Sequence, residues 1–196
     1  MNFEHLERAL LENLRSMWRI KFALTAAKNV DSSPSMPVSY SGLPTHTPSD
    51  LFSPSETVAQ AGEALIKLSD IPLATTFFLA SIAHYEGFLQ DNVTTTKSRP
   101  MLGGLQAAAE GNPSKPIRET TRKQGKEVRV RRNLLIHCGG VADQEYVTAA
   151  IDAGPLSGGV VAVVAPGTVV EITPAYFTYA TTVLIDYCRQ VAGSNV

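Results

Sequence analysis

The chain has 196 residues, 44% of them hydrophobic, which is enough to bury one sizeable core, and we expect one folded unit. Its net charge of −1 excludes a uniformly basic nucleic-acid-binding protein, so any such role must depend on a local patch. The two cysteines, Cys138 and Cys188, are too few and too far apart for a disulfide framework or a paired-cysteine metal site, and they fit a reducing compartment.

The N-terminal third of the sequence changes character once. Residues 1–28 carry apolar side chains at three- and four-residue spacings, which predicts an amphipathic helix. They lack the uninterrupted apolar run of a signal peptide or membrane span, so we expect a cytoplasmic protein without membrane contact. Residues 29–55 are rich in proline and serine and are predicted to be a loop or linker. A helical domain is expected over 56–196.

Helical signals dominate this domain. A helix to about Leu68 has Ser53 or Ser55 as a candidate N-cap, and Thr173 and Pro174 suit the N-cap and first position of the last helix. Gly125 is a candidate kink within the long basic segment. The predicted helices are 56–68, 72–93, 100–110, 115–137, 143–153 (capped by Asp143) and 174–192.

One segment has a different period. Residues 158–173 read as extended, and Pro166 and Gly167 suit a turn, so we predict a two-stranded hairpin there. The expected fold is therefore an all-α helical bundle with one small β-hairpin near the C-terminus.

Positive charge is concentrated in one of these helices. Residues 115–132 contain eight basic and two acidic residues, a local net charge of +6. At about 100° per residue, one arc of the helix collects most of the polar side chains and a histidine. A cationic strip that ends in a titratable group suits a polyanion and proton transfer at one of its phosphates, although a solvated helix face gives the same pattern. The arc contains Arg118, Arg122, Lys126, Arg129, Arg132, Asn133 and His137.

The end of this helix carries a motif. Arg132, Asn133 and His137 form R-N-x-x-x-H, followed by Gly139 and Gly140, which suit a left-handed helix end. This pattern resembles the R-x(4–6)-H signature of the HEPN superfamily, helical domains that include many metal-independent endoribonucleases. The segment FFLASIAHYEGFLQD is similar to an earlier central helix of that family and places Glu86 where members often have an acidic residue. In the branch of toxins paired with nucleotidyltransferases, the motif histidine begins H-x-Y. This chain has Gly139 in place of that tyrosine, so the resemblance does not extend to that branch.

The resemblance implies an endoribonuclease of defence, toxin or stress systems, without metal or other cofactor, that forms a homodimer in which two motifs face each other. The chemistry leads to the same requirement, because RNA cleavage through the 2′-hydroxyl needs a base and an acid, and one domain supplies one such histidine. His137 would transfer protons, Arg132 would bind phosphate oxygens, and Asn133 would orient the histidine ring or contact the backbone. Glu86 would support the site. The expected RNA-binding residues are Arg118, Arg122, Lys126, Arg129 and Arg131, and an antitoxin or another defence protein is an expected partner.

Other interpretations remain open. A histidine beside three apolar residues is often a structural residue or a helix cap. A HEPN-like module without turnover would keep the basic strip and bind RNA, nucleotides or a protein, and a purely structural bundle would do neither. Cys138 is not expected to act as a nucleophile with His137, because adjacent helical side chains point about 100° apart.

Overall fold

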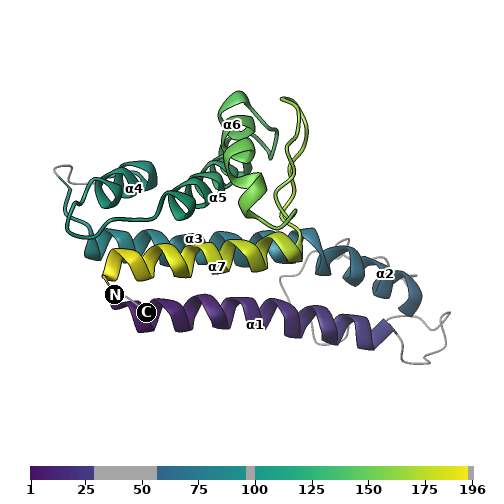
Figure 1. Cartoon of the computed structure of the whole chain (residues 1–196). Coiled ribbons are helices and arrows are strands. Elements are labelled where there is room, and N and C mark those ends of the chain that lie inside the picture. Colours follow the sequence, from purple (N-terminus) through teal and green to yellow (C-terminus); the bar gives the residue numbers. More distant parts are fainter. Residues whose placement is uncertain (29–56, 96–99, 194–196) are drawn as a thin grey trace.

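A computed structural model describes residues 1–28, 57–95 and 100–193, so the linker predicted over 29–55 lies outside the described residues. The described residues are mostly helical (Figure 1). The helices are α1 (Phe3–Lys28), α2 (Val58–Ser69), α3 (Ile71–Asn92), α4 (Leu102–Glu110), α5 (Glu119–His137), α6 (Gln144–Ala153), the short 3₁₀-helix η1 (Gly154–Leu156) and α7 (Pro174–Ala192).

The helices form a bundle in which α3 and α7 occupy the middle. Figure 1 shows α1 on one side of this pair and α4, α5 and α6 on the other, with α2 near one end of α1. Helix α5 packs on both α6 and α7, and α4 contacts α3 and α5. This arrangement holds α5 between three other helices, so that only part of its circumference can meet solvent or a ligand.

Apolar side chains from distant parts of the chain share one core. Leu6, Leu10 and Met17 of α1 are fully buried, in the same cluster as Phe78 of α3 and Phe177 of α7. Each such side chain contributes about 1.5–3 kcal/mol through removal from water. The N-terminal helix is thus part of the core of the helical domain.

Several predicted helix ends are confirmed. The side chain of Thr173 accepts from the N–H of Tyr176 and Pro174 begins α7, while Asp143 caps α6 by accepting from the N–H of Tyr146 at 2.8 Å. For α2 the cap is Thr57, which forms a reciprocal capping box with Gln60. The predicted caps of that helix, Ser53 and Ser55, lie outside the described residues.

Helix α5 differs from its prediction at its start and at Gly125. It begins at Glu119 rather than at Lys115, which precedes Pro116 and is therefore disfavoured in a helix. The Lys115 ammonium donates to the carbonyl oxygens of Val191 and Ala192 at the end of α7. Gly125 does not split it, since α5 is continuous from Glu119 to His137. A methyl group on Gly125 would lie 2.9 Å from Cδ2 of Tyr187, so the glycine allows α5 and α7 to approach closely.

The predicted β-hairpin is wrong, although its turn exists. Gly167 has φ of 86°, and the N–H of Thr168 donates to the carbonyl of Ala165. Within the described residues, however, 158–164 form no strand with the segment beyond the turn. That segment pairs instead with the chain leaving α5: the N–H of Ala142 donates to Thr168, and the N–H of Val170 donates to Gly140, each at 2.8 Å. One antiparallel bridge, Val141 to Val169, results.

In the described ranges, every helix is too short or too polar to cross a lipid bilayer.

Candidate functional site

His137 is the last residue of α5, and its side chain is exposed. The helix ends there because Gly139 and Gly140 adopt φ of 59° and 80°, which allows the N–H groups of Cys138 and Gly140 to donate to the carbonyl of Leu134 at 2.9 Å. In the part of the chain that the structure describes, no side chain forms a hydrogen bond with the His137 ring. Both ring nitrogens can therefore reach a ligand.

Arg132 lies one turn earlier and is held at two points. Its Nη1 donates to Oδ1 of Asn133 at 3.1 Å, and its Nη2 lies 3.9 Å from Oε2 of Glu86 on α3. The Arg132 side chain is 24% exposed, so it is partly buried but still reaches solvent. Two contacts leave further N–H donors for an anion. The structure thus brings together Arg132, Asn133 and Glu86.

The contact expected between Asn133 and His137 is not formed. Asn133 uses its side-chain oxygen for Arg132, and no hydrogen bond connects it to the histidine one turn later. Asn133 therefore orients the arginine of the motif, and the histidine has no orienting side chain within the described ranges.

Arg131 does not belong to an RNA-binding surface, and its prediction as such a residue is wrong. The residue is 4% exposed, and its Nε donates to Oε1 of Glu127 at 2.8 Å. Its other nitrogens donate to the carbonyl of Glu171 and the hydroxyl of Tyr146, while the guanidinium lies 3.6 Å from the centre of the Tyr176 ring. Each of its three side-chain nitrogens thus donates one hydrogen bond inside the protein, where the buried charge is matched by Glu127.

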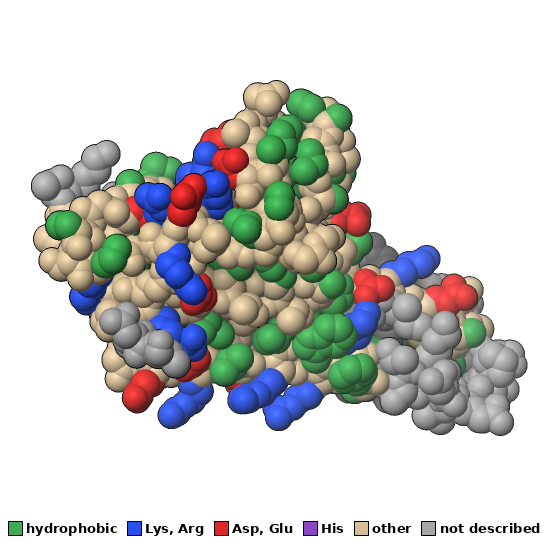
Figure 2. Space-filling model, viewed as in Figure 1, with side chains coloured by type: hydrophobic (Ala, Val, Ile, Leu, Met, Phe, Trp, Pro, Cys, Tyr) green, Lys and Arg blue, Asp and Glu red, His purple; other side chains and the backbone are tan. Residues whose placement is uncertain are grey.

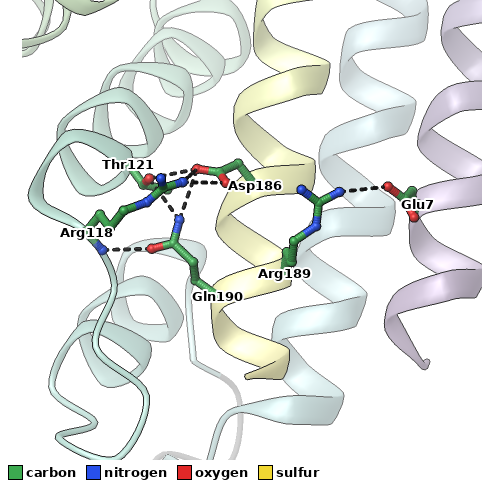
Figure 3. A network of polar contacts seen from close by, with 6 residues as sticks. All are labelled: Glu7, Arg118, Thr121, Asp186, Arg189 and Gln190. Atoms are coloured by element: carbon green, nitrogen blue, oxygen red, sulfur yellow. Dashed lines mark hydrogen bonds and ion pairs between the residues drawn. The ribbon is translucent and has the colours of Figure 1, made fainter. Parts of the chain in front are cut away.

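Arg118 also forms an ion pair within the chain, with Asp186, as Figure 3 shows. Its Nη2 lies 2.6 Å from each carboxylate oxygen of Asp186 on α7, and the backbone N–H of Arg118 donates to Oε1 of Gln190 at 2.7 Å. Thr121 and Gln190 donate to the same carboxylate. A second ion pair in this view, from Arg189 to Glu7, connects α7 to α1. Arg118 therefore anchors the start of α5 and adds little net charge to its surface.

The remaining basic residues of α5 differ in how far they are paired. Lys123 pairs with Glu119 at 2.9 Å, and Arg129 lies 3.7 Å from Glu145 of α6. Neither Arg122 nor Lys126 has an ion-pair or hydrogen-bond partner among the described residues. Figure 2 shows the same mixture on its face of the molecule, where Lys and Arg side chains lie among acidic ones. The net positive character of α5 thus depends chiefly on Arg122 and Lys126.

Three exposed apolar side chains surround the end of α5. Ile136, Val141 and Val169 are 47%, 40% and 61% exposed, and the last two are joined by the antiparallel bridge. We call these three residues the apolar rim. Large apolar side chains that gather beside a polar site are typical of a surface covered by another molecule.

Sequence reasoning missed several of these features. The spacing of Glu127 and Arg131, four residues apart, was a signal that the arginine is paired along its own helix. The pairing of Arg129 with Glu145 and the approach of α4 through Gly103 carry no local signal, because they join residues from different helices.

No family model, curated protein or solved structure matches this chain, so its function must be inferred from the residues and their arrangement.

Proposed function

We propose that this chain is a metal-independent endoribonuclease of the HEPN type, which acts as a homodimer in the cytoplasm in antiviral defence, toxin activity or a stress response. One observation carries the proposal. An exposed histidine without a protein partner in the described ranges, His137, ends the same helix on which Arg132 presents a guanidinium with open donor positions.

The two side chains match the needs of RNA cleavage. The 2′-hydroxyl attacks the neighbouring phosphorus, loses its proton to a base, and the 5′-oxygen leaves with a proton from an acid. Negative charge grows on the non-bridging oxygens, where a guanidinium can donate two parallel hydrogen bonds. Arg132 takes this second task, with Asn133 and Glu86 fixing its position, and His137 takes part in proton transfer.

A second copy of the chain supplies the other proton-transfer group. Two-fold symmetry brings the same surface of each copy together, and contact through the apolar rim would cover its exposed side chains while placing the two α5 ends near each other. An antitoxin or another defence protein would restrain the activity by covering this surface.

The test uses purified full-length protein and mixed-sequence RNA. His137→Ala and Arg132→Ala should each abolish cleavage without unfolding the protein. His5→Ala, at an exposed histidine on α1, should cleave like the wild type. Addition of a chelator should have no effect, and the products should end in a 2′,3′-cyclic phosphate and a 5′-hydroxyl. Retained cleavage by His137→Ala would remove the proposal.

A second candidate is a HEPN-like module that binds RNA, nucleotides or a protein without turnover. It is favoured by the lack of a described side chain that orients His137. Binding of RNA that weakens with salt, with no cleavage of varied substrates, would support this candidate over the first.

A further inference from the structure

Helices α4 and α5 enclose a groove of about 280 Å³ ahead of the R-N-x-x-x-H motif. The α5 side presents Arg122, Lys126 and Arg129, and the α4 side presents Gly103 and Ala107, among other residues. We call this feature the α4–α5 groove. The groove is lined by four basic residues, of which Lys123 is paired with Glu119; the other three extend over eight residues of helix, or about 10 Å at 1.5 Å per residue. The α5 wall is therefore cationic. The α4 wall is built in part from the small residues Gly103 and Ala107, which leave space for a ligand.

Two of the cations form no ion pair or side-chain hydrogen bond among the described residues. Arg122 and Lys126 are four residues apart on α5, a spacing at which like charges destabilise a helix by about 0.2–0.5 kcal/mol. Neither has an acidic partner in the described part of the chain. Of the two carboxylates that also line the groove, Glu119 is paired with Lys123, and Glu110 accepts from the neutral hydroxyl of Tyr187 at 3.0 Å and keeps its charge. The four basic residues of the lining still outnumber its two acidic ones.

The third cation is partly buried and lacks hydrogen bonds. The Nε of Arg129 is shielded from solvent without a hydrogen-bond partner among the described residues, and the side chain is 20% exposed. Its one ionic contact, to Glu145, is 3.7 Å long, which exceeds a hydrogen bond. A buried donor left without a partner costs about 1–3 kcal/mol. The shielded Nε is itself out of reach of a ligand, but Nη1 and Nη2 of Arg129 also have no hydrogen-bond partner among the described residues, so they can donate to an acceptor in the groove.

Gly103 makes room for this arginine. A methyl group at Gly103 would lie 3.0 Å from Nη1 of Arg129, so any side chain there competes with the guanidinium for the groove. The neighbouring Gly104 is exposed, and a methyl group there would meet only Pro100, at 3.9 Å. The two glycines therefore give a matched pair for changing the groove without changing charge.

We propose that the α4–α5 groove binds a backbone phosphate of single-stranded RNA, next to the strand that enters the motif. This inference rests on the proposed function for the identity of the RNA ligand. Arg129 meets the phosphate from the α5 wall, with Arg122 and Lys126 on the same side. From Arg122 to His137 the helix rises about 22 Å, enough for a strand to run from the groove to the histidine.

The chemistry of the groove favours a single strand of any sequence. Among the described residues that line it, none has an aromatic side chain on which a base could stack, so we expect these residues to contact phosphate and sugar. A single strand can turn one phosphate into a groove between two helices, whereas a duplex holds its phosphates on a rigid convex surface. Binding should therefore depend strongly on salt and weakly on sequence.

The charge test measures binding of a labelled single-stranded RNA at several salt concentrations, with His137→Ala present in every variant to prevent cleavage. Arg122→Gln with Lys126→Gln should lower the slope of log K against log salt by about 1.4, since each contact to a single strand contributes about 0.7. Arg15→Gln with Arg19→Gln removes the same charge from exposed sites on α1 and should leave the slope unchanged. Equal slopes in both pairs would overturn the proposal.

The steric test uses Gly103→Leu and Gly104→Leu, both checked for folding by thermal unfolding. Leucine at 103 should weaken RNA binding at least tenfold, while leucine at 104 should bind like the parent; equal affinities would refute a groove site. Inorganic phosphate and duplex RNA identify the occupant. Phosphate binding without RNA binding, or duplex binding equal to that of the single strand, would contradict the single-stranded RNA assignment.

The results test the groove site and the proposed nuclease activity independently of each other. Absence of cleavage by the wild type, with groove-dependent RNA binding, removes the proposed activity and leaves the groove site standing. Cleavage that requires His137, with no effect of the groove variants on RNA binding, supports the proposed nuclease and removes the groove site.

Discussion

Glu127 and Arg131 form an ion pair of 2.8 Å in which both side chains are almost completely shielded from solvent. The hydroxyl of Tyr176 donates to the second carboxylate oxygen at 2.9 Å, and Tyr146 and Glu171 complete the coordination of the guanidinium. The pair lies on α5 against α6 and α7 and fixes the inner face of the helix. Arg132, the next residue, points in a different direction, towards Glu86 of α3.

Removing one partner of this pair should be strongly destabilising. Glu127→Ala leaves a buried guanidinium without its counter-charge, which we expect to lower the free energy of unfolding by about 3–5 kcal/mol. Glu119→Ala breaks a pair of the same spacing on the same helix, but at the surface, and should leave the unfolding temperature almost unchanged. Chemical denaturation of both variants measures the difference. Similar small losses would mean that the Glu127–Arg131 pair does not stabilise the fold.

The contact between α5 and α7 should not tolerate a side chain at residue 125. In Gly125→Ala the added methyl group would lie 2.9 Å from the Tyr187 ring, and we expect a loss of about 1–3 kcal/mol from overpacking, despite the better helix propensity of alanine. Gly87→Ala, with open space around the new methyl group, should gain about 0.5–1 kcal/mol. Thermal unfolding of the two variants should shift in opposite directions, and a stabilised Gly125→Ala would be inconsistent with this packing.

Alkaline pH should destabilise the fold through its buried tyrosines. Burial raises the pKa of Tyr146 to about 12, above the ordinary value of 10.0. The folded state thus keeps this proton to a higher pH than the unfolded state, so the contribution is complete below pH 10 and is lost as pH rises from 10 to about 12. Tyr146→Phe should show a shallower loss of unfolding free energy in this window. Burial raises the pKa of Tyr176 as well, so part of the slope should remain.

The apolar rim should be needed for dimer formation. Val169→Lys places a charge on a side chain that is 61% exposed, so the monomer should fold normally while the proposed dimer dissociates and cleavage is lost. Val163→Lys, at a site of 58% exposure outside the rim, is the matched control. Analytical ultracentrifugation of both variants reports the oligomeric state. A dimer that survives Val169→Lys with full activity would exclude the rim as the interface.

The sequence predicts local features of this fold better than pairings between elements. The start of α7 at Thr173 and Pro174 could be predicted because a cap and a first-turn proline act within one turn of chain. The partner of residues 168–170 could not, since β-propensity does not say which extended segment lies alongside, and here it is the chain that leaves α5.

The candidate site shows the same division. Arg132, Asn133 and His137 could be placed on one helix end from spacing, and Glu86, expected as a supporting residue from the family resemblance, lies 3.9 Å from Arg132. Helical period did not reveal that α6 and α7 cover Arg131, because burial of a polar face depends on neighbours distant in sequence. Nor did it reveal that Asp186 neutralises Arg118.

The central claim is that two copies of the chain each supply one His137 to the same site. After subunit exchange between wild type and His137→Ala at equal amounts, a site that needs both histidines retains activity only in wild-type pairs, about one quarter of the activity of an equal total amount of wild type. Independent sites in each copy would leave about one half. RNA cleavage that follows the square of the wild-type fraction supports the account, and a linear dependence contradicts it.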